Sequence, residues 1–131
     1  MSEWPQPGGY PSNAMYHLAA PGRLREVWSQ DAGKGNDIDS HLTSAPVVAA
    51  GLIYVQDSEA HVFAFRATDG RPVWDRSLAP RNGTDWPTLW GLLGKPNTIK
   101  PPQGMGGGVA YDDGKIFVTS GFGVVICLDA R

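Results

Sequence analysis

The sequence contains a single cysteine, Cys127, and no run of Lys or Arg. One thiol cannot form an internal disulfide, and its place inside a predicted strand argues against a lipidation site. The 11 Lys and Arg are outnumbered by 13 Asp and Glu, which gives a net charge of −2 and no basic field for nucleic acid. No apolar stretch is long enough to cross a bilayer as a helix. These absences exclude a disulfide scaffold and make nucleic-acid binding an unfavourable hypothesis.

Motifs that carry catalysis or metal binding are also missing. The three His residues have no Cys or carboxylate at ligand spacing, and no Ser or Cys has a recognisable nucleophile context. The acidic loop at residues 31–39 lacks the ordered alternation and terminal Glu of a calcium loop, so a solvated loop is favoured. The glycine run at residues 104–108 lacks the Lys of a phosphate loop. The sequence therefore predicts no catalytic, metal-binding or cofactor-binding residue.

What the sequence does contain is an internal repeat. Val47–Thr68 and Ala110–Arg131 align without a gap at an offset of 63 residues. The identical pairs are Gly51/Gly114, Ile53/Ile116, Val55/Val118, Val62/Val125 and Ala67/Ala130. Repetition of one supersecondary unit is typical of solenoids and propellers, in which each unit buries its apolar faces against its neighbours. This pattern predicts a piece of a larger repeat structure, and we expect open apolar faces to promote self-association.

Each copy of the repeat reads as a β-hairpin preceded by a third strand. The first copy has runs of β-branched and aromatic residues at 52–55 and 61–65, and the second copy has them at 116–118 and 124–128. The preceding strands are predicted at 46–48 and 109–111, before turns at Gly51 and at 112–114. These strands are apolar on both faces, which suits a sheet that lies between two other sheets.

A fourth strand is predicted from Gly70 to Trp74, and Gly22 to Trp28 shows the same pattern, so that Trp28 and Trp74 stand 46 residues apart. Four-stranded units at this spacing are typical of propeller blades. We therefore expect an all-β fold, a β-propeller of four-stranded antiparallel blades present as a fragment of about two to three blades. The predicted parts are an amino-terminal segment with an outer strand (1–28), a blade (44–79), an inter-blade insertion (81–103) and an incomplete blade (104–131).

Five residues are predicted to have structural roles in this docking of blades: Trp28, Trp74, Gly51, Gly70 and Gly114. A Trp ring at the end of an outer strand can stack on the neighbouring blade, and the glycines serve tight turns. Loss of such a packed Trp typically costs about 3–5 kcal/mol.

The insertion is predicted to contain a short helix. Thr84 and Asp85 can cap it, and one face carries the apolar residues Trp86, Leu89, Trp90 and Leu93. This face must either pack on the propeller or meet a partner, and packing is the simpler alternative because two exposed Trp would favour aggregation. We keep partner or client binding as the hypothesis for these four residues.

Residues 64–74 resemble the tryptophan-docking repeat of quinoprotein-like propellers, in which an Ala-Leu-Asp-Ala stretch, a turn and a Trp recur in each blade. Residues 127–130 begin a further copy, and Arg66 and Asp69 depart from the pattern. Within this superfamily the chain resembles BamB-type outer-membrane protein assembly factors. The segments that carry this resemblance are residues 4–18, 44–49, 106–111 and 118–123.

The resemblance implies a non-catalytic scaffold without a cofactor. The resemblance implies an eight-bladed ring that a lipid anchor holds in the periplasm. No lipid-anchor site is found in this sequence. Their implied partners are the membrane-embedded β-barrel assembly subunit and unfolded outer-membrane client proteins. The alternative is a fragment of a dehydrogenase that holds pyrroloquinoline quinone and calcium on the same propeller, with acidic and amide ligands and a vicinal cysteine pair.

Overall fold

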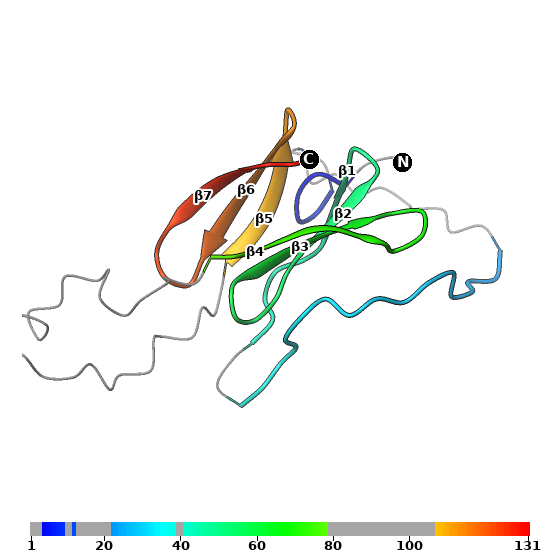
Figure 1. The fold of residues 1–131 in the computed structure, drawn as a ribbon, viewed down its shortest axis with the longest axis horizontal. Coiled ribbons are helices and arrows are strands. Elements are labelled where there is room, and N and C mark those ends of the chain that lie inside the picture. Colours follow the sequence, from blue (N-terminus) through cyan, green and yellow to red (C-terminus); the bar gives the residue numbers. More distant parts are fainter. Residues whose placement is uncertain (1–3, 10–11, 13–21, 39–40, 79–106) are drawn as a thin grey trace, which may run out of the picture.

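The computed structural model describes residues 4–9, 12, 22–38, 41–78 and 107–131. Within these ranges the regular secondary structure consists of β-strands alone (Figure 1). The strands are β1 (Val47–Ala49), β2 (Leu52–Gln56), β3 (His61–Arg66), β4 (Pro72–Ser77), β5 (Gly107–Asp112), β6 (Lys115–Ser120) and β7 (Val125–Asp129). The prediction of two hairpins, each preceded by a third strand, is confirmed.

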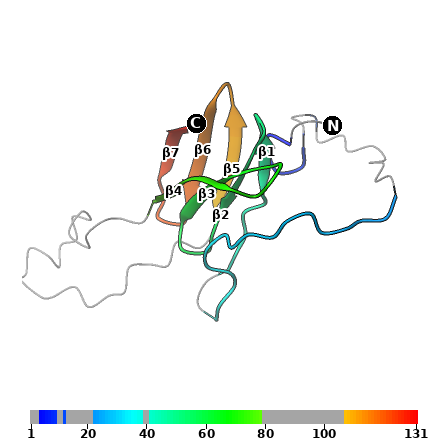
Figure 2. The same cartoon turned by 45° about the vertical axis from the view of Figure 1, so that its right-hand side comes forward.

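The strands form two antiparallel sheets that lie side by side (Figures 1 and 2). The first sheet has the order β1-β2-β3-β4 and the second has the order β5-β6-β7, so each sheet is a simple meander. The predicted fold class is thus confirmed: the chain is an all-β partial propeller with one four-stranded and one three-stranded blade. No helix in the described ranges is long and apolar enough to span a membrane.

Two-residue turns set the register of both meanders. Ala49 pairs with Leu52 across one turn, and Asp112 pairs with Lys115 across the other. The turn residues all have positive φ, which is the geometry of the hairpin turns that match strand twist. The φ values are 51° at Ala50, 77° at Gly51, 43° at Asp113 and 74° at Gly114. The repeated glycine therefore serves the same backbone position in both copies.

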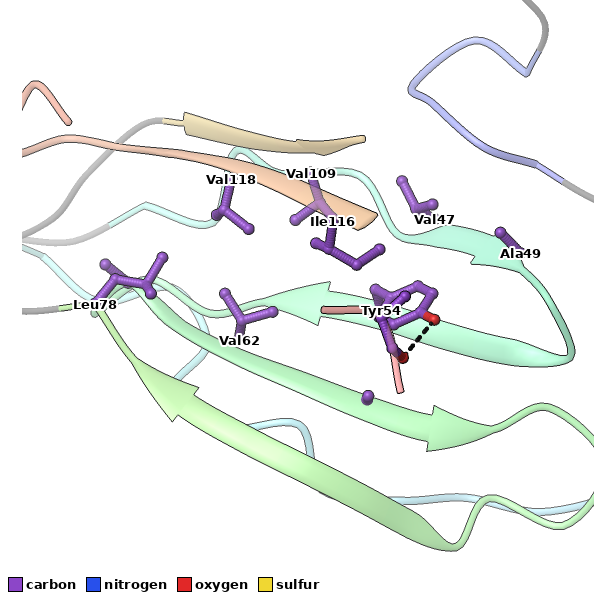
Figure 3. Packing of buried hydrophobic residues seen from close by; sticks show 11 residues of the cluster. Val47, Ala49, Tyr54, Val62, Leu78, Val109, Ile116 and Val118 are labelled. Atoms are coloured by element: carbon purple, nitrogen blue, oxygen red, sulfur yellow. Dashed lines mark hydrogen bonds between the residues drawn. The ribbon is translucent and has the colours of Figure 1, made fainter. Parts of the chain in front are cut away.

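The core lies between the two sheets (Figure 3). Side chains of the first sheet meet side chains of β5 and β6, and burial alternates along β6 as expected for a strand with one covered face. The buried residues are Val47, Ala49, Tyr54, Ala60, Val62, Ala64, Leu78, Val109, Ile116, Val118 and Ala130. The aliphatic residues supply apolar area, and each fully buried Val or Ile contributes roughly 1.5–3 kcal/mol.

Residues 22–28, predicted as an outer strand, pair with no strand among the described residues. A strand needs a neighbour to satisfy its backbone groups, and the described part of the chain places none beside this segment. The predicted helix of the insertion, with Trp86, Leu89, Trp90 and Leu93, lies outside the described residues.

Candidate functional site

Trp74 of β4 is one of the residues that join the two sheets. Its indole Nε1 donates a hydrogen bond to the carbonyl oxygen of Ala130 at 3.3 Å. Its ring also meets the ring of Tyr54, with centroids 6.0 Å apart and planes tilted by 42°. Such tilted aromatic pairs add about 0.5–1.5 kcal/mol beyond their buried area. Trp74 therefore connects the outer strand of one blade to the end of the next blade.

Tyr54 of β2 makes a second bond to the same carbonyl. Its hydroxyl donates to the Ala130 oxygen at 3.0 Å, which is the dashed line in Figure 3. The ring is fully buried and stacks on Tyr111 at a centroid distance of 6.4 Å. Burial raises the pKa of Tyr54 from 10.0 to about 12, with smaller contributions from Tyr111 and Asp129. The hydroxyl is thus a stable donor at neutral pH.

Gln56 gives a third connection at the other end of β2. Its side chain is buried, and Nε2 donates to the carbonyl oxygen of Thr119 at 3.2 Å. Thr119 is the residue aligned with Gln56 in the second copy of the repeat. Three polar side chains of the first blade therefore bond to backbone carbonyls of the second blade.

Trp28 repeats the contact of Trp74 one unit earlier. Its Nε1 donates to the carbonyl oxygen of Ala67 at 3.1 Å, and Ala67 is aligned with Ala130 in the repeat. The ring lies against Gly70, where an added Cβ would come within 2.6 Å of the Trp28 ring and where φ is +71°. Glycine is therefore required at this position both for space and for backbone conformation.

The turn that receives Trp28 is held by the two residues that depart from the family pattern. The guanidinium of Arg66 lies 3.1 Å from the Asp69 carboxylate, which also accepts a hydrogen bond from the Arg71 amide at 3.1 Å. The Gly70 amide donates to the Arg66 carbonyl at 2.9 Å. The two departures thus form a pair with each other, which sequence reasoning missed because it judged each position separately.

Sequence reasoning also missed Asp57, which organises the turn between β2 and β3. Its carboxylate accepts backbone hydrogen bonds from Glu59 at 2.9 Å, His61 at 2.8 Å and Lys34 at 3.1 Å. The Ser58 hydroxyl lies 3.1 Å from the Lys34 carbonyl oxygen. The signal was present, because Asp at a turn commonly accepts from the amide two residues on. This carboxylate fixes the irregular segment at residues 22–38 to the first blade.

The acidic loop forms ion pairs at the surface. Lys34 Nζ lies 3.4 Å from a Glu59 oxygen and 3.5 Å from an Asp37 oxygen. The hydrogen bond to Glu59, together with its charge, raises the pKa of Lys34. The described residues contain no group of three or more His, Cys, Asp and Glu placed to hold a metal ion.

The remaining predicted residues lie apart from the Trp contacts. Gly51 and Gly114 occupy the two tight turns described above, and an added Cβ at either position would meet open space. Cys127 is an exposed free thiol on β7. Trp86, Leu89, Trp90 and Leu93 fall outside the described residues.

The part of the sequence that contains Trp28 and Trp74 matches a known family. The family model described as Outer membrane protein assembly factor BamB matches residues 15–86, which is more than half of the chain. The chain belongs to this family. The BamB match includes the whole first blade and the complete contact between Trp28 and Ala67. It also includes Trp74, whereas Ala130, which accepts the Trp74 hydrogen bond, lies outside the match. The predicted membership of a BamB-type, PQQ-repeat family is thus confirmed, while no curated protein matches the chain.

Proposed function

We propose that this chain is part of a non-catalytic scaffold subunit of the outer-membrane β-barrel protein assembly machinery. The observation that carries the proposal is the BamB family match over residues 15–86. The site agrees with it, because Trp28, Trp74 and Tyr54 use their polar atoms to bond backbone carbonyls between structural units. Such contacts hold neighbouring blades together, as a scaffold on which other proteins dock requires.

The proposed partners are the membrane-embedded β-barrel assembly subunit and unfolded outer-membrane client proteins. The proposed location is the periplasmic side of the outer membrane, reached through a lipid anchor outside this sequence. Family membership supports both statements. The residues proposed for partner contact are Trp86, Leu89, Trp90 and Leu93, because the sequence predicts a short helix with these two Trp and two Leu on one face.

The test is binding of the intact chain to the purified periplasmic domains of the assembly subunit. We expect saturable binding that weakens at least tenfold in a Trp86→Ala/Trp90→Ala variant. The matched control is Leu24→Ala/Ile38→Ala, which removes two side chains that are 90% and 92% exposed. Absence of binding by a folded chain would contradict the scaffold proposal.

The same sample distinguishes the rival dehydrogenase function, which the shared PQQ repeat motivates. Pyrroloquinoline quinone and calcium are titrated together while Trp fluorescence is recorded. Saturable quenching that depends on calcium would favour a quinoprotein, since the cofactor's carboxylates and quinone oxygens take part in calcium coordination. The scaffold proposal predicts no calcium-dependent quenching.

A further inference from the structure

Residues 4–9 contact both blades, although they lie far from either blade in the sequence. The Trp4 amide donates a hydrogen bond to the Val48 carbonyl oxygen at 2.5 Å, and the Val48 amide donates to the Trp4 carbonyl oxygen at 2.9 Å. This mutual pair is an antiparallel bridge between Trp4 and β1 (dark blue segment near β1 in Figure 1). Trp4 therefore extends the first sheet by one residue on the side of β1 that is opposite β2.

The next residue of the segment contacts the second blade. The Tyr111 amide on β5 donates to the Pro5 carbonyl oxygen at 2.8 Å. Val48 and Tyr111 are aligned with each other in the internal repeat. Two consecutive carbonyls, those of Trp4 and Pro5, thus accept hydrogen bonds from equivalent amides of two neighbouring blades. The segment crosses from one sheet to the next instead of following a single strand.

These hydrogen bonds lie at the inner edges of the blades. β1 and β5 are each the first strand of a sheet, and each is paired with one neighbouring strand, β2 or β6. Because β4 forms the opposite, outer edge of its sheet, the edge at β1 faces the central channel around which propeller blades are arranged. A blade has four strands, so further blades of a ring leave this inner edge without another strand. Such an edge presents unpaired N–H and C=O groups to any extended chain.

The composition of residues 4–9 ends the strand pairing after Trp4. Pro5 and Pro7 have no backbone N–H, and proline at a sheet edge prevents the addition of another strand. The Gly9 amide donates to the Gln6 carbonyl oxygen at 2.9 Å, and φ is 83° at Gly8 and 85° at Gly9. Glycine adopts this left-handed conformation without steric cost, so the chain turns sharply after Gln6. The segment therefore covers the edge with few residues and offers few donors for further pairing.

We propose that residues 4–9 are a clasp that fastens the inner edges of two neighbouring blades and takes up the edge amides that another strand would use. β1 and β5 contact each other, and Val47 and Val109 of these strands belong to the shared core. The clasp spans this contact from the channel side, whereas Trp74 of the outer strand β4 joins the same two blades through Ala130. Blades joined at two separate places cannot hinge about one of them, so the clasp restricts their relative motion. This role goes beyond the proposed scaffold function and does not depend on it.

The first experiment measures hydrogen exchange of single backbone amides by NMR in the full chain. Trp4→Pro removes the N–H that bonds Val48, and the matched control Trp4→Ala removes the same indole but keeps the N–H. We expect the Val48 and Tyr111 amides to exchange at least tenfold faster in Trp4→Pro than in the unsubstituted chain, with a smaller increase in Trp4→Ala. The Ala64 amide should not change, because its strand is paired on both sides and reports that the fold persists. No increase in Trp4→Pro, an increase at Val48 alone, or equal increases in both variants would overturn the proposal.

The second experiment locks the clasp with a disulfide. In a Cys127→Ser background, a Trp4→Cys/Val48→Cys variant is oxidised in dilute solution, and Gln6→Cys/Val48→Cys is the control two residues out of register. Residues that exchange both hydrogen bonds across an antiparallel pair have Cα atoms about 5.5 Å apart, within the range that a disulfide spans. We expect the disulfide within one chain to form at least tenfold faster in the first variant than in the control.

The locked clasp should also change the second blade. Once the disulfide has formed on β1, exchange of the Tyr111 amide on β5 should slow, because the clasp can no longer leave. This effect on the other blade is expected only if one segment bridges both. Equal rates of disulfide formation in the two variants, or exchange at Tyr111 that the disulfide leaves unchanged, would overturn the proposal.

Discussion

The first and second blades are built from the same repeated unit, yet they differ in what surrounds them. In the first blade β3 has a strand on each side, and Tyr54 and Val62 are fully buried. In the second blade β7 has one neighbouring strand in the described chain, and the aligned Phe117 and Val125 are exposed. At these two positions the residue type is the same or similar in both copies (Val62/Val125 and Tyr54/Phe117), so the neighbouring sheet decides the burial. A repeat of this kind acquires most of its stability from its interfaces.

The largest difference in stability is expected between substitutions of the two Trp residues. Trp74→Ala should lower the free energy of unfolding by about 3–5 kcal/mol, because it removes the ring against Tyr54 and the bond to Ala130. Trp28→Ala should cost less, since Trp28 holds a segment that pairs with no described strand. Urea unfolding measures both. Equal midpoints for Trp74→Ala and Trp28→Ala would contradict this ranking, and Trp74→Phe serves as the control that keeps an aromatic ring.

A second pair of variants compares one residue type in two surroundings. Val62→Ala should cost about 2–3 kcal/mol, because it leaves a cavity between the sheets. Val125→Ala should change the stability of the monomer by less than about 0.5 kcal/mol, since this side chain is exposed. Thermal unfolding of dilute samples provides the comparison. A cost for Val125→Ala that matched the cost for Val62→Ala would mean that the outer face is already covered within one chain.

The turns of the two hairpins should also differ in how much a side chain of the turn contributes to the free energy of unfolding. Asp57→Ala should cost about 1–2 kcal/mol, because three backbone amides lose a carboxylate acceptor. The aligned Ser120 has a buried hydroxyl with no hydrogen-bond partner in the described structure, so Ser120→Ala should be close to neutral. Asp57→Asn should recover part of the loss, as it keeps one oxygen acceptor. Similar unfolding midpoints for the two alanine variants would show that Asp57 does not anchor its turn.

The smallest expected effect is that of the Tyr54 hydroxyl. Tyr54→Phe should cost about 1 kcal/mol at neutral pH through the lost bond to Ala130. The pKa of Tyr54 is raised from 10.0 to about 12 in the folded chain, so the folded state holds this proton more tightly than the unfolded state. The resulting stability is complete below pH 10 and is lost as the pH rises toward 12. Between pH 8 and 12 the free energy of unfolding should therefore fall less steeply with pH in Tyr54→Phe than in the unsubstituted chain. The same pH dependence of the free energy of unfolding in both chains would show that the buried Tyr54 hydroxyl does not contribute to stability in this way.

Sequence reasoning found the strands because the pattern of β-branched and aromatic residues is local and is repeated. It also pointed to Trp28 and Trp74 as docking residues, and the structure gives each indole a carbonyl partner one repeat apart. The stabilising role of these contacts stays a prediction until the Trp variants are measured. The sequence did not predict which faces are covered, because coverage depends on the neighbouring sheet.

Other features escaped prediction because they depend on pairs of residues. Arg66 and Asp69 each depart from the family pattern, but together they brace the turn. Asp57 and Lys34 are 23 positions apart and meet only once residues 22–38 fold back on the first blade. The outer strand expected at residues 22–28 has the right sequence and lacks a neighbour in the described chain. Local propensity is therefore insufficient where a strand is defined by its partner.

The most direct test of the central claim, that neighbouring strands and sheets decide which parts of each blade are covered, is hydrogen exchange at the amides of β3 and β7. In a dilute sample, the amides on both edges of β3 should be protected, and the amides of β7 that do not face β6 should exchange at rates similar to those of loops. Equal protection of β3 and β7 in the dilute sample would contradict the account.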